Sequence, residues 1–469
     1  MSKNTVPLVV ASSVVIVLFI GARATFRLAA VQWSLRYCNC TKQPNSSRTA
    51  RRRIRQIWKF GPSKLTSVLP YSYRECRDGE TGRRSGLKIR RPERAVGVQV
   101  PLPAPDFKRP RPRENISFSA AHRHPIPMRI LVIGGNGFIG APLMRQLQAG
   151  GHEIAVFHRT ANPDAPSSGI TYIRGDRNHL PNHRADLDRF SPEVIVDLIL
   201  SSGEQAKQLM ETAAAVARRV VVISSMDVYR AWGVVQGIES GPLEPLPLTE
   251  SSPLRTVRRL YPAEHIKSLQ GIFSWLSDDY DKIAVEEAVM NDRRIPATVL
   301  RLPMVYGPGD PLHRFFHLLK RIADQRPFVI LPDDFAAWRG PRGYIDNVAH
   351  AIALAATSDT AAGRIYNVCE EPTLSELEWQ TRIAKTADWH GRFITLPRER
   401  TPKHLLLPGN TAQHVIASSH RIRTELRYNE PFETKEAIHR TIEWEQQNPP
   451  GTVNPQQFDY PAEDAVLAT

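Results

Sequence analysis

The segment that most constrains the fold of this chain is a glycine-rich turn, Gly134-Gly-Asn-Gly-Phe-Ile-Gly140, which connects two segments of different character. The run before it, Arg129-Ile-Leu-Val-Ile133, is short and almost wholly apolar, as is typical of a buried parallel strand. The stretch after it, Phe138 to Leu147, is typical of a helix, and Gly150-Gly151 ends it. The sequence therefore predicts a strand, a tight turn and a helix in immediate succession.

A strand, a glycine turn and a helix form the unit that binds the pyrophosphate of a dinucleotide. Gly134 permits the tight turn, Gly137 lets the backbone approach the phosphates, and Gly140 allows the helix to pack closely on the strand. The helix N-terminus adds free N–H groups and a partial positive charge. Together with Phe138 and Ile139, which complete the turn, these glycines are the predicted cofactor-binding positions.

The alternation of apolar runs and helical stretches from Met128 onward indicates the fold. Predicted strands are Arg129 to Ile133, Glu153 to Phe157, Thr171 to Arg174, Val194 to Leu198, Val220 to Ile223 and Ala297 to Leu300. Predicted helices between them are Leu143 to Gln148, Glu204 to Ala217 and Lys282 to Asn291. This order implies right-handed crossovers and an α/β fold with a doubly wound parallel (Rossmann) sheet, with the cofactor across the carboxyl ends of the strands.

The chain is expected to divide into four segments. Residues 1–127 are predicted to be a disordered basic leader, 128–302 a Rossmann domain, 303–448 a smaller mixed α/β substrate lobe, and 449–469 a tail. The leader holds 25 Lys/Arg and 6 Asp/Glu, whereas residues 128–469 hold 37 and 41, a net charge of −4. The folded part therefore gives no electrostatic reason to expect nucleic-acid binding. Its single cysteine, Cys369, excludes a disulfide framework and fits a reducing, cytoplasmic location.

Two features of the leader need separate interpretations. Residues 6–22 are mostly apolar, which is the lower limit for a membrane anchor and also fits a signal-peptide core. The Arg- and Pro-rich residues that follow lack a period of 2 or 3.6, so we expect them to be disordered. Residues 79–105 resemble the translation of a transfer-RNA gene, and Met128 stands directly before the first strand. We therefore expect that residues 1–127 come from a start site placed too far upstream.

The end of the second predicted strand, Phe157-His-Arg-Thr160, lies about twenty residues after the glycine turn. An acidic residue there would hold the ribose 2′-hydroxyl of NAD, and this segment has none. Arg159 is suited instead to a 2′-phosphate, so NADP is the expected cofactor, with NAD as the alternative. The other interpretation of Arg159 is an arginine solvated at a strand end.

Further motifs follow the glycine turn in a fixed order. They are Gly175-Asp-Arg177, Ser224-Ser-Met-Asp-Val-Tyr229, Arg301-Leu-Pro-Met-Val-Tyr-Gly-Pro-Gly-Asp310, Gly343-Tyr-Ile-Asp-Asn-Val-Ala349 and Ile365-Tyr-Asn-Val368. From Met128 to about Pro449 the chain resembles the extended and atypical short-chain dehydrogenase/reductase proteins, the NAD(P)-dependent epimerase/dehydratase family. By this resemblance Asp176 hydrogen-bonds the adenine amino group, and Arg177 beside it is a further cofactor-binding position.

The resemblance also implies a catalytic set. In this family a Ser or Thr polarises the substrate carbonyl, a Tyr transfers the proton, and a Lys four residues after the Tyr binds the ribose and lowers the tyrosine pKa. Ser225 matches the Ser position, because Val228-Tyr229 follow at the family spacing, and Lys282 matches the Lys position. Four residues before Lys282, however, stands Asp278 and not a tyrosine.

Tyr280 is the one phenol in this segment, and its position is ambiguous. Two residues of separation correspond to about 200° around a helix, which would turn Tyr280 away from the face of Lys282. If the helix begins at or after Tyr280, the ring could still reach inward. The resemblance places Pro303 under the nicotinamide, and Arg339 and Arg342 near a substrate-phosphate arginine, although without the usual spacing.

Two functional hypotheses follow from these residues. The first is an NAD(P)-dependent oxidoreductase or epimerase/dehydratase that acts on a nucleotide sugar or a related hydroxy or carbonyl compound. We expect no metal site, because His313 and His317 form no metal-ligand pattern. The second is a cofactor-binding protein without redox activity, such as a sensor, a scaffold or an RNA-binding factor. Ser225 and Lys282 favour the enzyme, whereas Asp278 favours the second hypothesis. A homodimer is compatible with either.

Overall fold

The computed structural model of the chain describes residues 127–159 and 169–468. The expectations for the leader, including an anchor at residues 6–22 and the upstream start, concern residues 1–126, which lie outside the described residues. Within the described part of the chain, none of the helices combines the length and the apolar character that crossing a membrane requires.

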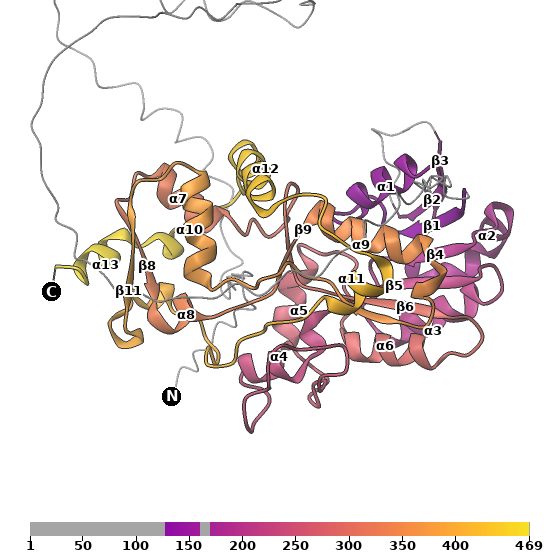
Figure 1. Cartoon of the computed structure of the whole chain (residues 1–469), viewed down its shortest axis with the longest axis horizontal. Coiled ribbons are helices and arrows are strands. Elements are labelled where there is room, and N and C mark those ends of the chain that lie inside the picture. Colours follow the sequence, from indigo (N-terminus) through magenta and orange to yellow (C-terminus); the bar gives the residue numbers. More distant parts are fainter. Residues whose placement is uncertain (1–126, 160–168, 469) are drawn as a thin grey trace, which may run out of the picture. The chain divides into compact units, whose positions relative to one another are not determined.

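A parallel sheet of seven strands, ordered β10-β6-β5-β4-β1-β2-β3, forms the centre of the larger part of the fold (Figure 1). Its strands are β1 Arg129–Ile133, β2 Glu153–His158, β3 Ile170–Arg174, β4 Val194–Asp197, β5 Arg219–Ser225, β6 Ala297–Leu302 and β10 Ile365–Asn367. All neighbouring strands run parallel, which confirms the predicted doubly wound α/β fold. Because β1 lies between β2 and β4, the strand order reverses there, and ligands bind at such a reversal.

Helices cover both faces of this sheet. They are α1 Gly140–Ala149 and α9 Ile345–Thr357 on one face, and α2 Arg184–Phe190, α3 Gly203–Ala213 and α6 Lys282–Asn291 on the other. Side chains of β1 alternate between two cores, with Ile130 and Val132 in the first and Leu131 and Ile133 in the second. Burial on both faces explains why the strands are continuous apolar runs and why the sequence predicted them well.

The element boundaries agree closely with those expected. α6 begins at Lys282 and ends at Asn291, as predicted, whereas α1 begins at Gly140 because residues 138 and 139 belong to the turn. β5 extends two residues further than expected, to Ser225. This extension brings Ser225 to the carboxyl edge of the sheet.

A second lobe contains two further parallel strand pairs. β7 Met304–Tyr306 pairs with β9 Arg342–Tyr344, and β8 Phe328–Pro332 pairs with β11 Arg392–Leu396. Its helices are α7 Phe316–Ala323, α8 Asp333–Ala337, α10 Glu376–Thr386, α12 Thr434–Gln447 and α13 Tyr460–Ala465. After Pro303 the chain also returns to the large sheet, through α9 and β10, and the boundary at residues 302 and 303 stays a prediction.

The remaining elements connect these layers. They are α4 Arg230–Val235, α5 Ala263–Gln270, α11 His420–Leu426 and the short 3-10 helices Arg177–His183, Met226–Val228, Asp359–Ala361, Arg398–Arg400, Lys403–Leu405 and Pro455–Phe458.

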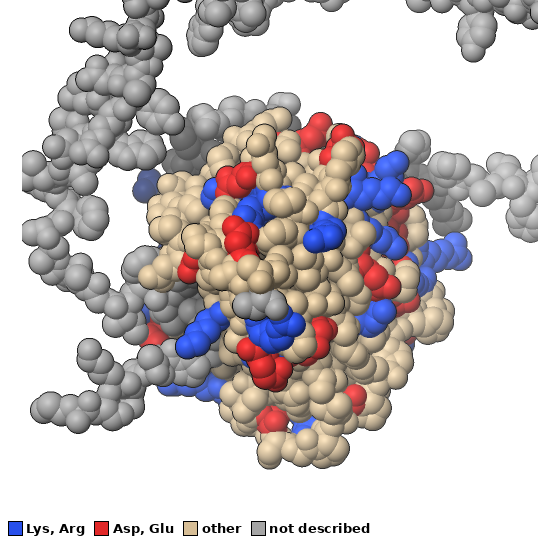
Figure 2. Space-filling view, turned by 90° about the vertical axis from the view of Figure 1, so that its left-hand side faces the viewer, with Lys and Arg blue, Asp and Glu red and all other residues tan. Residues whose placement is uncertain are grey.

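On the outer face of the second lobe, basic and acidic side chains lie interspersed (Figure 2). Several are paired, as Lys320 is with Asp324 at 2.7 Å. The segment expected as a tail carries α13, whose buried Glu463 accepts a hydrogen bond of 2.6 Å from Arg321.

Candidate active site

Two adjoining cavities lie along the carboxyl edge of the large sheet. The first, the turn cavity, is lined by Gly134, Gly137, the end of β2 and Asp176, and encloses about 1150 Å³ of space, part of it open to solvent. The second, the serine cavity, is lined by Ser225, Lys282 and residues of the second lobe, and encloses about 1070 Å³, also partly open. Trp275 and Leu276 line both, so the two cavities form one cleft across the strand-order reversal.

The glycine turn has the geometry that a pyrophosphate site requires. Gly134 has a φ of +85°, and a Cβ there would lie 2.7 Å from a methyl carbon of Ile199. A Cβ on Gly140 would lie 2.4 Å from the carbonyl oxygen of Gly135, so only glycine lets α1 start this close to the turn. Gly137 donates its N–H to the Gly134 carbonyl at 3.1 Å and lines the turn cavity. The residues present therefore fit a bound dinucleotide.

The predicted adenosine-side residues meet in the turn cavity. The exposed Arg159 donates a hydrogen bond of 2.8 Å to Ser274 Oγ. Asp176 is the one carboxylate among the described residues lining this cavity, and it accepts an N–H from Asn178 at 2.9 Å. Arg177 lines the cavity but is buried in an ion pair of 2.8 Å with Asp197. Its Nη2 thus stabilises the end of β4, whereas its buried Nε and Nη1 have no hydrogen-bond partner among the described residues.

Two adjacent serines at the end of β5 have different partners. Ser224 Oγ donates a hydrogen bond of 2.6 Å to Glu286, a buried carboxylate that also pairs with Arg301 at 2.7 Å. Ser225 Oγ accepts an N–H from Asp227 at 3.1 Å and lines the serine cavity. Ser224 is thus tied to the core by a charged network, and the Ser225 hydroxyl retains its proton for a ligand.

Lys282 lies at the first turn of α6, under the serine cavity. Its side chain is buried, and its Nζ donates to the carbonyl oxygens of Leu200 and, at 2.9 Å, Ile223. Burial lowers the pKa of Lys282 to about 8, although the nearby carboxylate of Asp227 acts in the opposite direction. The ammonium group is therefore positioned between β4 and β5, at the centre of the cleft.

Tyr280 reaches the serine cavity because α6 begins only at Lys282. Asp281 caps the helix with its side chain, so Tyr280 lies in irregular chain before the helix, and the opposite-face argument does not apply. The phenol donates a hydrogen bond of 2.7 Å to Asp227 Oδ2. Asp278, in contrast, is exposed and bonds Lys267 at 2.8 Å, outside the cleft. The carboxylate at the tyrosine position of the family therefore does not enter the site.

Asp227 is the residue that the sequence interpretation missed, although it stands only two positions after Ser225. It is 6% exposed, and burial raises the pKa of its carboxyl group, opposed mainly by Arg255, whose Nη2 lies 3.9 Å from Oδ1. Burial and the neighbouring carboxylate together raise the pKa of Tyr280 well above its ordinary value. A second phenol, Tyr261, also lines the cavity, with its ring centroid 5.9 Å from that of Tyr280.

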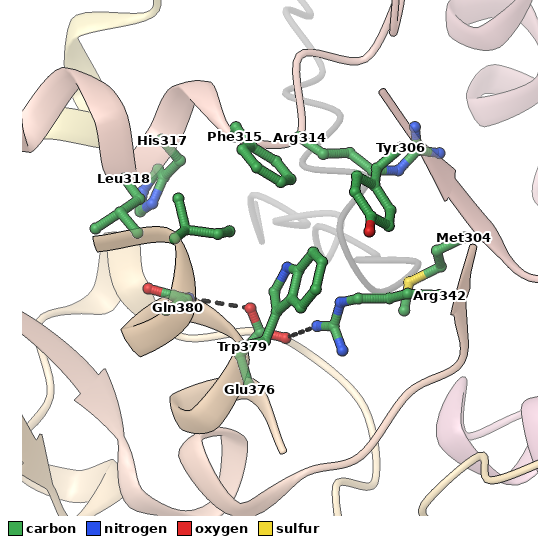
Figure 3. Close-up of a pocket in the computed structure, with 11 residues that line it drawn as sticks. Met304, Tyr306, Arg314, Phe315, His317, Leu318, Arg342, Glu376, Trp379 and Gln380 are labelled. Carbon is green, nitrogen blue, oxygen red and sulfur yellow. Dashed lines mark hydrogen bonds and ion pairs between the residues drawn. The ribbon is translucent and has the colours of Figure 1, made fainter. Parts of the chain in front are cut away.

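The remaining predicted residues fall into two groups. Phe138, Ile139 and Pro303 line the serine cavity together with Lys282. Arg342 lies in a separate small pocket, where it pairs with Glu376 (Figure 3), and Arg339 pairs with Glu378 at 3.1 Å. Neither arginine lines the serine cavity.

The described residues contain no group of three or more His, Cys, Asp or Glu side chains that could hold a metal ion. Tyr280, Ser225, Lys282 and Asp227 are polar groups that line one predominantly apolar cavity. Such a set is suited to proton transfer at a carbonyl or hydroxyl group beside a cofactor.

The chain is similar to several known proteins. Two curated relatives are the 2′-dehydrokanamycin reductase of Streptomyces kanamyceticus, 26% identical over 59% of this chain and 72% of the relative, and the 2-alkyl-3-oxoalkanoate reductase of Stenotrophomonas maltophilia, 27% identical over 51% and 69%. The solved structure of the Bordetella bronchiseptica enzyme WbmG in complex with NAD superimposes with a TM-score of 0.50 at 17% identity, covering 69% of this chain and 95% of that one. That likeness concerns the fold.

The sequence match shows to which family the chain belongs. Residues 130–270 and 276–369 match the model of the NAD dependent epimerase/dehydratase family, which is half of the chain. The match confirms the predicted nicotinamide cofactor and favours the enzyme over the non-redox hypothesis. The chain belongs to the NAD dependent epimerase/dehydratase family.

Proposed function

We propose that the protein is an NADP-dependent oxidoreductase that interconverts a carbonyl and a hydroxyl group at the polar groups of the serine cavity. The observation that carries the proposal is the phenol of Tyr280, which lines the same cavity as Ser225 and Lys282 and bonds a buried carboxyl group there. A small-molecule substrate held in that cavity would have its reacting oxygen within reach of the hydroxyl groups. The bound cofactor would supply or accept the hydride.

The choice of NADP rests on Arg159. Its guanidinium lies at the end of β2 in the turn cavity, where the ribose 2′-substituent of a dinucleotide is bound in this type of fold. Arg159 is exposed, and within the described residues its guanidinium donates to the neutral hydroxyl of Ser274, so no described carboxylate neutralises its charge and a 2′-phosphate could pair with it. We propose that Asp176 holds the adenine from the next loop.

We propose that Ser225 and Tyr280 act on the substrate oxygen from one side. The Ser225 hydroxyl can donate to that oxygen because its Oγ only accepts a hydrogen bond from the Asp227 N–H. Tyr280 then delivers the proton as the carbonyl carbon receives the hydride. A tyrosinate left beside a negative Asp227 would be strongly disfavoured, as the raised pKa of Tyr280 indicates.

No tyrosinate needs to form beside a negative Asp227 if Asp227 is protonated before the reaction begins. Burial raises the pKa of its carboxyl group, and a protonated Asp227 would donate across the same 2.7 Å contact, so that its proton passes to Tyr280 as the phenol gives its own proton to the substrate. The products are then an alcohol, the oxidised cofactor and an Asp227 carboxylate that Arg255 stabilises. In the reverse direction the same pair removes the hydroxyl proton.

Lys282 is proposed to bind the cofactor ribose and to hold positive charge next to the Asp227 carboxylate. Its ammonium group already bonds two backbone carbonyls at the sheet edge, so it needs no reorganisation to present its remaining N–H group. The proposal is tested by titrating the protein with NADPH and then following its oxidation at 340 nm with a panel of ketones. Turnover that is lost in Tyr280→Phe supports it. Tight NADPH binding with no oxidation by any carbonyl compound would refute it.

A further inference from the structure

We propose that the serine cavity accepts an uncharged, mainly apolar carbonyl or hydroxy compound and excludes the diphosphate of a nucleotide sugar. This inference rests on the oxidoreductase function proposed above and specifies its substrate class. It follows from the chemistry of the cavity walls and from the partners of the cationic side chains near them.

The walls of the serine cavity are predominantly apolar. Thirteen of its 21 lining residues are Leu, Ile, Val, Phe, Trp or Pro. One wall comes from a single segment, residues 261–280, in which α5 and the loop after it contribute Leu269, Phe273, Trp275 and Leu276. Apolar substrate area placed against such a wall gains about 25 cal/mol per Å² that is removed from water.

The same segment is where the chain departs from the family pattern. The match to the family is interrupted at residues 271–275, and these include Phe273 and Trp275. The loop also carries Asp278 outward, away from the cleft. The aromatic residues Phe273 and Trp275 therefore lie outside the family match, and the cavity itself indicates the substrate class.

The cationic side chains that line the serine cavity already have partners. Lys282 donates to two backbone carbonyls beneath it. Arg314 donates to Asp310 at 2.6 Å, and that carboxylate is 1% exposed. Burial lowers the pKa of His265, which favours its neutral form. A diphosphate in this cavity would carry about two negative charges without a matching cation, and an unpaired charge in an apolar site is strongly unfavourable.

The arginines that resemble a phosphate site are also engaged. In Figure 3 the guanidinium of Arg342 points at Glu376, with the Trp379 ring beside it, 4.8 Å from the guanidinium carbon. Arg339 bonds the Thr373 carbonyl at 2.7 Å and Glu378 at 3.1 Å. Binding of a phosphate to either would require breaking an existing ion pair.

A neighbouring cavity of about 1260 Å³, partly open to solvent, extends the site into the second lobe. It shares Leu312 and Arg314 with the serine cavity, and its apolar lining residues are Phe316, Ile330, Leu331, Pro332, Phe335, Leu405, Leu406, Leu407, Pro450 and Val453. Arg321 Nη1 lies 2.9 Å from His317 Nε2, and burial together with that positive charge lowers the pKa of His317 well below its ordinary value, which favours the neutral imidazole. An apolar substituent longer than the serine cavity could continue there.

The test compares two probes on the full chain saturated with NADP, by isothermal titration calorimetry. The probes are 2-octanone, which is uncharged and apolar, and UDP-glucose. We expect 2-octanone to bind, and UDP-glucose to bind at least tenfold more weakly. Phe273→Arg should weaken 2-octanone binding about tenfold, the scale of losing a few methylene contacts. The matched control is Ile272→Arg, because Ile272 is 43% exposed on the same loop and lies outside the cavity lining.

Each outcome separates this inference from the proposed function. Stronger binding of UDP-glucose than of 2-octanone, no binding of either, or equal effects of the two arginine substitutions would overturn the inference. Oxidation of NADPH at 340 nm is measured in parallel with both probes. If 2-octanone binds as expected but no carbonyl compound is reduced, the substrate class stands and the oxidoreductase function fails.

Discussion

The two ends of the cleft are built in different ways. At the turn cavity, the side chains follow directly from short sequence motifs at the ends of consecutive strands, because the glycine turn and β2 are adjacent in both sequence and space. At the serine cavity, the decisive contact joins Tyr280 to Asp227, 53 residues apart. The cofactor end therefore follows a pattern shared by many proteins, whereas the substrate end depends on how residues 261–280 cross the sheet edge.

The largest expected effect is at the turn. Gly140→Val should abolish NADPH binding, because its Cβ would lie 2.4 Å from the Gly135 carbonyl oxygen and the turn would have to open. Fluorescence titration with NADPH and urea unfolding measure the loss. Gly451→Val is the control, since a Cβ there meets nothing within 4 Å. Normal NADPH affinity in Gly140→Val would show that the glycine turn does not bind the cofactor.

The next effect concerns the substrate end. Tyr280→Phe should lower kcat for carbonyl reduction by about 10²- to 10⁴-fold, the usual contribution of a positioned proton donor, and should leave NADPH affinity unchanged. Stopped-flow oxidation of NADPH measures the rate. Tyr366→Phe is the control, because that phenol bonds Glu425 outside the cleft. Full activity of Tyr280→Phe would exclude the phenol of Tyr280 as the proton donor.

A smaller effect is expected in the pH dependence. Because burial raises the pKa of Asp227, the folded protein binds this proton more tightly than the unfolded chain does. Asp227 therefore contributes stability at low pH that is lost as the pH rises through its raised pKa, and kcat for reduction should fall over the same range. Asp227→Asn should remove this contribution from the pH dependence of stability and from the pH dependence of kcat. An unchanged kcat–pH profile in this variant would exclude Asp227 as the proton reservoir.

The smallest expected effect is a change of NADPH affinity at the cofactor end of the cleft. Arg159→Ala should weaken NADPH binding by about 1–3 kcal/mol through loss of a charge-assisted contact to the 2′-phosphate, and should leave NADH binding nearly unchanged. Calorimetric titrations with both cofactors measure the difference. Arg189→Ala, on the exposed end of α2, is the control. Equal affinities for the two cofactors in the unmodified protein would refute the assignment to NADP.

The sequence predicted the sheet and the turn because both depend on local patterns. Buried strands are continuous apolar runs, and α6 was delimited correctly by its own residues. The sequence could not decide whether Tyr280 faces the cleft, since that depends on Asp281 capping the helix after it. It also gave no sign that Asp227 would be buried beside Arg255, because that burial comes from long-range packing.

Isotope transfer follows the proposed hydride transfer to a carbonyl carbon, with Tyr280 as the proton donor. The protein is incubated with NADPH carrying deuterium at the transferred position and with a panel of neutral ketones, and the alcohols formed are analysed by mass spectrometry. The account predicts one deuterium on the carbinol carbon with the unmodified protein and none above background with Tyr280→Phe. Absence of deuterated alcohol with every ketone, or equal labelling by Tyr280→Phe, would contradict it.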